Sequence, residues 1–274
     1  MVIISPHSLF SLAMKKYWSI FKIQVVNSLA YPGELIGRSV VIIPFMWIFY
    51  QLWKVTFAAS GTTSISGLTL HDTLWYLMLA ETVELSRPPL ARTIADNVKD
   101  GSIAYLLNKP YNFLLYQLSS SMGESVFRAG MNAILGGIVV WWVVGPPPDP
   151  RGWPLTFIAI VGAWILNFCV NAMIGLAAFI AEDVAPFLWI YQKFAFIFGG
   201  LLIPLDFYPQ WLQVISRFLP FSSMVYGPAR LFVSPSLSAF VTVLSMQLTW
   251  ILILGLLLVL AYRRGVSYLT VNGG

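Results

Sequence analysis

Charged residues are scarce in this sequence. Asp, Glu, Lys and Arg make up 10% of its 274 residues, whereas 58% of the residues are hydrophobic. A soluble domain carries roughly 25% charged residues, because its surface must be hydrated. The scarcity of charge therefore excludes an ordinary soluble enzyme or binding domain. It predicts an all-α membrane protein, because lipid must cover the surface that charged side chains cannot.

Cysteine and histidine are also nearly absent. The single cysteine, Cys169, excludes a disulfide framework and a thiolate metal site. The two histidines, His7 and His71, are predicted to lie on opposite sides of the membrane, so they cannot share a metal ion. The sequence contains no Gly-Lys-Ser or Gly-Lys-Thr phosphate loop, no His-Glu-x-x-His motif and no Gly-x-Ser-x-Gly motif. We expect no catalytic residue, no metal site and no ATP bound directly to this chain.

Long apolar runs are plentiful, and a hydrocarbon core of roughly 30 Å needs about 20 apolar residues per helix. The runs predict six transmembrane helices, at residues 35–57, 71–85, 125–144, 155–181, 187–202 and 239–262. We treat residues 1–274 as a single transmembrane domain, with an interfacial segment over 1–33, the six-span bundle over 34–262 and a cytoplasmic tail over 263–274. A basic amphipathic helix from Leu9 to Val26 suits the inner membrane surface. Prolines interrupt residues 203–235, which predicts short re-entrant helices before the last span.

The basic residues predict the orientation of the bundle. With both termini in the cytoplasm, twelve of the 16 Lys and Arg residues fall on the inner side, in agreement with the positive-inside rule. Cytoplasmic loops then account for the net charge of +5 without a nucleic-acid partner. We predict a multi-pass protein of a lipid membrane, with both termini cytoplasmic.

A short amphipathic segment follows the second predicted span, from Asp96 to Pro110. Its apolar residues are Ile103, Leu106 and Leu107, and a proline ends it. This apolar face is too small to form a core by itself. It is buried against other membrane helices or a soluble partner, or it is an ordinary loop helix on the lipid surface. Charges beside such a patch suit a docking surface of mixed character.

Ionisable and amide residues occur inside the predicted spans. Glu124 and Arg128 have the i,i+4 spacing of a favourable ion pair, and a pair between Glu84 and Arg128 is the alternative. Charges in hydrocarbon usually pair or face water, so these residues either join helices or line a polar substrate path. Asn167 and Asn171 share one face of the fourth span and are predicted to join helices by hydrogen bonds.

The order of these features resembles the ABC-2 type transport permeases, the membrane subunits of bacterial ATP-driven exporters. The resemblance covers nearly the whole chain. It rests on the basic helix before the first span, the segment Gly101-Ser-Ile-Ala-Tyr-Leu-Leu-Asn-Lys-Pro110 and the proline-rich stretch before the last span. The start Tyr31-Pro-Gly-Glu34 and the tail beginning at Tyr262-Arg-Arg-Gly add to it.

The resemblance implies that residues 96–110 form a coupling helix that docks in a cleft of an ABC ATPase. Ile103, Leu106 and Leu107 would be its apolar anchor, between Gly101 and Pro110, and Asp96, Lys99 and Asp100 would be its polar rim. ATP and Mg²⁺ would bind the partner ATPase only. A second permease, identical or a sister chain, would complete a dimer in the bacterial inner membrane.

The resemblance also implies export by alternating access, through a cavity between the second and fifth spans. Trp75 and Leu79 on the second span and Phe194 and Phe198 on the fifth are the candidate path residues. The aromatic residues of the fifth span serve lipid contact and packing equally well. An ion-coupled secondary transporter without an ATPase partner is the rival prediction.

Overall fold

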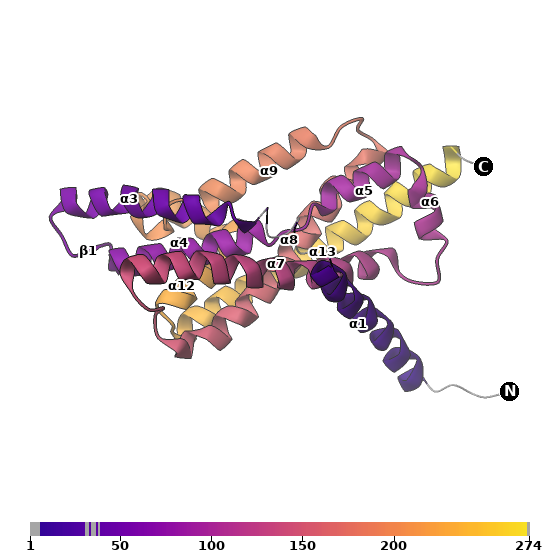
Figure 1. Ribbon diagram of the computed structural model, residues 1–274. Coiled ribbons are helices and arrows are strands. Elements are labelled where there is room, and N and C mark those ends of the chain that lie inside the picture. The colour runs from indigo at the N-terminus through magenta and orange to yellow at the C-terminus, as the bar shows by residue number, and fades with distance from the viewer. Residues whose placement is uncertain (1–5, 31–32, 34–36, 38, 273–274) are drawn as a thin grey trace.

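The computed structural model describes residues 6–30, 33, 37 and 39–272, with side chains described for residues 14–30, 33, 37 and 39–267. These residues are almost entirely helical (Figure 1). In chain order the elements are α1 (Pro6–Ala30), α3 (Ile42–Ser60), β1 (Ser64–Ile65), β2 (Leu68–Thr69), α4 (Leu70–Leu85), α5 (Leu90–Lys99), α6 (Ser102–Leu107), α7 (Phe113–Val144), η1 (Pro150–Gly152), α8 (Trp153–Leu176), η2 (Ala177–Phe179), α9 (Ala185–Phe198), η3 (Leu205–Phe207), α10 (Gln210–Phe218), α11 (Pro220–Met224), α12 (Tyr226–Val233) and α13 (Leu237–Asn272). The prediction of an all-α membrane protein is confirmed.

Four stretches of the described chain are long and apolar enough to cross a membrane on their own, at residues 42–60, 113–144, 150–179 and 237–267. The helices at the second and fifth predicted spans are shorter. α4 has 16 residues and α9 has 14, which correspond to about 24 and 21 Å of helix. Four of the six predicted spans therefore correspond to helices long enough to cross a membrane, and the second and fifth stay predictions.

The bundle has two ends, which we name by their local structure. The hairpin end carries β1–β2 and the turn after α7, and the elbow end carries α5, α6 and the C-terminus; they lie left and right in Figure 1. α8 and α13 both run from the hairpin end to the elbow end. A Cβ atom on Gly152 would lie 2.9 Å from Pro235 Cβ at the start of both helices, and one on Gly265 would lie 2.5 Å from the ring of Phe179 near their ends.

α4 and α5 together run the length of the bundle. At the hairpin end, His71 Nε2 lies 2.8 Å from Pro146 O in the turn after α7. At the other end of α4, Trp164 Nε1 of α8 donates a 2.8 Å hydrogen bond to Ser86 Oγ. α5 then continues along α8. Pro88 and Pro89 lack the N–H groups that a continuous helix needs, so the chain breaks between the two helices.

α7 begins 12 residues before the predicted third span, at Phe113 instead of residue 125. Polar residues in this extension lowered its hydropathy, but Gln117 and Ser121 are buried. α1 packs on α7 at this level. A Cβ atom on Gly123 would lie 2.6 Å from Phe21 O, so the glycine permits the close approach. The hydropathy boundary was wrong because a second helix, rather than lipid, covers this part of α7.

The predicted proline-rich stretch forms η3 and the short helices α10, α11 and α12. α11 and α12 are mostly buried and pack on α4, α8 and α13, whereas α10 keeps most of its residues exposed. The residues assigned to a cytoplasmic tail continue α13 as a helix as far as Asn272. The motif that starts at Tyr31 falls largely outside the described residues.

Candidate functional site

The elbow between α5 and α6 is the predicted coupling segment, and a tight turn holds its two helices together. Gly101 has φ of 77°, a left-handed conformation that glycine adopts without steric cost. Ser102 N donates a 2.8 Å hydrogen bond to Asp100 Oδ1, and Ser102 Oγ donates to Asn97 Oδ1 over 3.0 Å. The hydrogen bonds from Ser102 lower the pKa of Asp100 below its usual value. The turn is therefore pre-organised with a charged carboxylate at its tip.

The apolar side of α6 faces its own subunit. Ile103 is 0% exposed and belongs to the main hydrophobic core, together with Phe113. Leu106 and Leu107 are half-buried against the same core. The expectation that Ile103 inserts into a partner does not fit this burial, because the bundle itself already covers the side chain.

The exposed side of the elbow carries an aromatic residue that the sequence reasoning missed. Tyr105 is 69% exposed, and Lys109 Nζ lies 4.6 Å from its ring centroid. Asp96, Lys99 and Asp100 are exposed on the same elbow, as are Gly101 and Pro110. Two residues after Ile103, Tyr105 points about 200° away around the helix. If Ile103 is placed on the face toward the bundle, this spacing alone predicts that Tyr105 is exposed.

The elbow is attached to α8 through a close contact. A Cβ atom on Gly175 of α8 would lie 2.7 Å from Ile94 Cβ and 3.0 Å from Ala91 O, both in α5. Ile94 is fully buried. α1 contacts the other side of this region, since Lys16 Nζ donates to Pro110 O over 2.7 Å and Tyr17 Oη accepts from Asn112 N over 2.9 Å. A displacement of the elbow must therefore act on α8 and α1 as well.

A polar network lies where α4 meets α5. Glu84 forms an ion pair with Arg87, with oxygen–nitrogen distances of 2.8 and 2.6 Å. The Arg87 guanidinium lies 5.7 Å from the ring centroid of Tyr191 in α9. Tyr191 Oη donates a 2.8 Å hydrogen bond to Asn167 Oδ1 in α8, and Asn171 Nδ2 donates to the same oxygen. The network joins three helices through side chains.

The predicted ion-pair residues lie close to this junction. Arg128 pairs with Glu124 on α7, four residues earlier. Glu84 pairs with Arg87, so the structure offers Glu84 a nearer partner than the Arg128 of the alternative prediction. Each pair joins residues three or four positions apart in the chain. In both arginines the Nε atom has no hydrogen-bond acceptor among the described residues.

The four candidate path residues differ in burial. Trp75 and Leu79 are buried in the core, where Trp75 contacts Phe232 with ring centroids 5.9 Å apart. Phe194 is exposed on α9 and stacks on Phe198 at 5.5 Å. Core packing accounts for the burial of the first two residues, and their assignment to a path stays a prediction.

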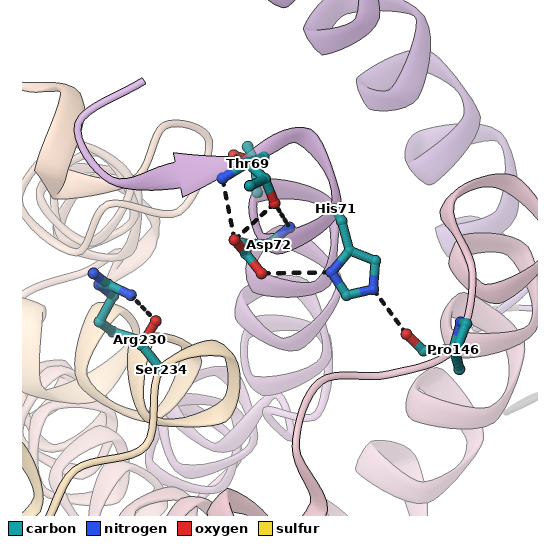
Figure 2. Close-up of polar contacts among 7 residues, drawn as sticks. Thr69, His71, Asp72, Pro146, Arg230 and Ser234 are labelled. Atoms are coloured by element: carbon teal, nitrogen blue, oxygen red, sulfur yellow. Dashed lines mark hydrogen bonds and ion pairs between the residues drawn. The ribbon is translucent and has the colours of Figure 1, made fainter. Parts of the chain in front are cut away.

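The hairpin end contains a second group of polar contacts (Figure 2). Thr69 and Asp72 form a capping box that begins α4, with hydrogen bonds of 2.7 to 3.2 Å. His71 lies between Asp72 and the carbonyl of Pro146, and Arg230 donates to Ser234 (Figure 2). Within residues 14–30, 33, 37 and 39–267, no three His, Cys, Asp or Glu side chains are grouped to hold a metal ion. These contacts close helix ends instead.

The comparison with known families agrees with the architecture. Residues 41–273 match the family described as ABC-2 family transporter protein. No curated protein and no solved structure matches the chain. The match covers all six apolar helices, the elbow and the short helices of the hairpin end. The chain belongs to the ABC-2 transporter family and is the membrane permease of an ABC transporter rather than an enzyme.

Proposed function

We propose that this permease works as the membrane subunit of an ATP-driven exporter and that a separate ATPase docks on its elbow. The observation that carries the proposal is the contrast within α6, where Ile103 is buried in the bundle and Tyr105 is 69% exposed. A helix held by one face presents the other to a partner in a fixed geometry. Tyr105, with Asp96, Lys99 and Asp100 around it, supplies the aromatic centre and charged rim common in protein interfaces.

The packing of the elbow supports a route for coupling. A partner that displaces α6 displaces α5, and the contact of α5 with Gly175 passes the movement to α8. The network from Arg87 through Tyr191 passes it to α9. ATP and Mg²⁺ on the partner would shift the population between inward- and outward-facing states, because the partner binds the two states with different affinity.

We propose six membrane crossings, with α4–α5 and α9 as the two short ones. α3 and α7 both end near the hairpin end, where His71, just after the hairpin, contacts Pro146. The chain therefore returns between them, and α4–α5 forms that return. α9 forms the return between the end of α8 and the start of α13, which lie at opposite ends. Both termini then lie in the cytoplasm of a bacterial inner membrane, and a second permease would cover the short helices.

Cysteine labelling tests the topology, because the only native cysteine, Cys169, is buried. In a Cys169→Ala background, Tyr105→Cys and Arg151→Cys are each exposed to a membrane-impermeant maleimide on intact cells. Six crossings predict labelling at position 151 and protection at position 105. If α4–α5 and α9 do not cross, the two results are exchanged, and that outcome rejects the proposed topology.

The same two variants test docking. A maleimide–diazirine linker is attached to Tyr105→Cys through its maleimide. Photolysis on inside-out vesicles inserts the carbene into any nearby bond, and it is expected to join this position to a protein that carries a phosphate-binding loop, identified by mass spectrometry. ATP is expected to change the yield, and Arg151→Cys is the matched control at the opposite end. Failure of Tyr105→Cys to cross-link while it reacts freely with a monofunctional maleimide would contradict docking at the elbow.

One observation favours the rival function of an ion-coupled transporter. Glu81 is 4% exposed in α4, and its Oε1 has no hydrogen-bond partner among the described residues. A buried carboxyl group of this kind is used as a proton site in some transporters. Glu81→Gln separates the two: it abolishes transport driven by an ion gradient but leaves ATP-driven transport active in vesicles without a gradient.

A further inference from the structure

A polar cavity of about 340 Å³ lies at the break between α4 and α5. α7, α8 and α9 supply its other walls, and its charged residues are Glu84, Arg87, Arg92 and Arg128. A volume near 340 Å³ is at the lower end of the range for small-molecule sites, which is about 300 to 1,000 Å³. The cavity therefore has room for a headgroup rather than for a whole amphiphile.

The charges around the cavity favour an anion. Its one acidic lining residue, Glu84, is held by Arg87 through two close contacts, and Arg128 is paired with Glu124 outside the lining. Arg92 is exposed and has no hydrogen bond or ion pair with any described residue. One positive charge is therefore left over, and no lining carboxylate is free to receive a cation.

Polar groups that point to a missing ligand lie in the same walls. A guanidinium has five N–H donors, and the Nε atoms of Arg87 and Arg128 are buried without an acceptor among the described residues. Asn132 of α7 also lines the cavity; it is 1% exposed, and its Oδ1 has no partner in the described chain. Buried polar groups are usually hydrogen-bonded, so this cluster needs a polar occupant.

The surroundings of the cavity are apolar. Leu85 and Leu188 contribute to its lining, and beside it α9 exposes Phe187, Ile190 and Phe194. An apolar chain attached to the bound headgroup could lie along this face of α9. The site thus joins two surfaces of different chemistry, as the binding of an amphiphile requires.

We propose that this cavity binds the phosphate or carboxylate headgroup of an anionic amphiphile, which is the substrate class of this permease. Arg92 attracts the anion, and Arg128 and Arg87 donate hydrogen bonds to it. Asn132 Oδ1, which can only accept, pairs with the P–OH group of a headgroup phosphate that keeps one proton. The inference rests on the proposed function for its reference to transport. Binding itself needs no ATPase, so it can be measured on the permease alone.

The test compares three ligands by calorimetry on purified permease in a neutral maltoside detergent. The ligands are dodecyl phosphate, dodecyltrimethylammonium and inorganic phosphate. The expected result is saturable binding of dodecyl phosphate, at least tenfold tighter than that of the cationic amphiphile. Weak or absent binding of inorganic phosphate assigns the site to an amphiphile. Equal affinity for inorganic phosphate overturns that assignment, and equal affinity for the cation overturns the proposal.

Variants then locate the binding. Arg92→Gln is expected to weaken binding of dodecyl phosphate about tenfold, the loss of one charge-assisted contact. The double variant Glu124→Gln/Arg128→Gln removes the second arginine without leaving a single buried charge. Arg151→Gln at the hairpin end is the matched control and should bind as the native chain does. Unchanged affinity in Arg92→Gln, an exposed position that tolerates substitution, rejects the site even if the double variant unfolds. The cross-linking result at position 105 is independent of either outcome.

Discussion

The two ends of the bundle use short helices in opposite ways. At the hairpin end, α11 and α12 are inserted among α4, α8 and α13, and Tyr76 Oη donates a 2.7 Å hydrogen bond to Gly200 O. At the elbow end, α6 has one buried residue, Ile103, and an exposed Tyr105. Many contacts hold the first group of helices, whereas few hold the second. The hairpin end is therefore closed by its own helices, whereas the elbow leaves an aromatic side chain exposed, which agrees with the proposed docking of a partner there.

The largest expected effect separates the two sides of α6. Ile103→Ala removes a fully buried side chain and is expected to destabilise the permease by about 2 to 5 kcal/mol. Tyr105→Ala removes an exposed side chain, so its effect on stability should stay within about 0.5 kcal/mol. Thermal unfolding in detergent measures both. Similar melting temperatures for the two variants would mean that α6 is not held as described.

The second largest loss of stability is expected from a substitution at the contact between the elbow and α8. Gly175→Ala places a Cβ atom 2.7 Å from Ile94 Cβ, and this overpacking should cost about 1 to 3 kcal/mol. Gly130→Ala is the matched control, because nothing lies within 4 Å of a Cβ atom there. If coupling passes through this contact, Gly175→Ala also lowers ATP-driven transport more than Gly130→Ala does. Identical behaviour of the two alanine variants would remove α8 from the coupling route.

The residues compared in these two predictions show which features of the fold the sequence predicts and which it does not. Hydropathy identified the apolar helices and the short amphipathic segment after the second of them, because burial in lipid leaves a long-range signal in composition. It failed where one protein segment covers another. Gln117 lay outside the predicted third span although it is buried, and Ile103 was expected to enter a partner although the bundle covers it. Gly175 is a small residue of the kind that permits close helix packing, but the sequence does not show which helix packs there, since the atoms that surround it come from a helix some 80 residues earlier in the chain.

The contacts of the candidate site could be predicted from the sequence only in part, for the same reason. Glu124 and Arg128 are four residues apart on one helix, so local spacing identified their ion pair. The link from Arg87 to Tyr191 joins different helices, and so does the hydrogen bond from Tyr191 to Asn167. Contacts of that kind depend on how the helices pack, which no local pattern in a single sequence records. The sequence left open that Glu84 and Arg128 line a polar path, but it did not place Arg87, Arg92 and Asn132 beside them.

A smaller effect is expected at the hairpin end. His71→Ala removes the contact with the Pro146 carbonyl, and the loss of one partly exposed hydrogen bond should cost about 0.5 to 1.5 kcal/mol. Many other contacts hold this end, so the melting temperature should fall slightly and transport should persist. Loss of transport without loss of stability would show that the hairpin end moves during the cycle, and the contrast between the two ends would then be wrong.

The smallest expected effect is the pH response of the elbow turn. Hydrogen bonds from Ser102 lower the pKa of Asp100 below its usual value of 3.8. A carboxyl group whose pKa is lowered by folding stabilises the folded turn above its unfolded pKa, and this stabilisation disappears as the pH falls through the lowered folded pKa. The turn should therefore keep its structure near neutral pH and loosen only below about pH 4. Hydrogen exchange of a peptide spanning residues 97–107, corrected for intrinsic rates, measures the change. Asp100→Asn, which cannot titrate, should remove the pH dependence, and a transition that persists in this variant would place the responsible group elsewhere.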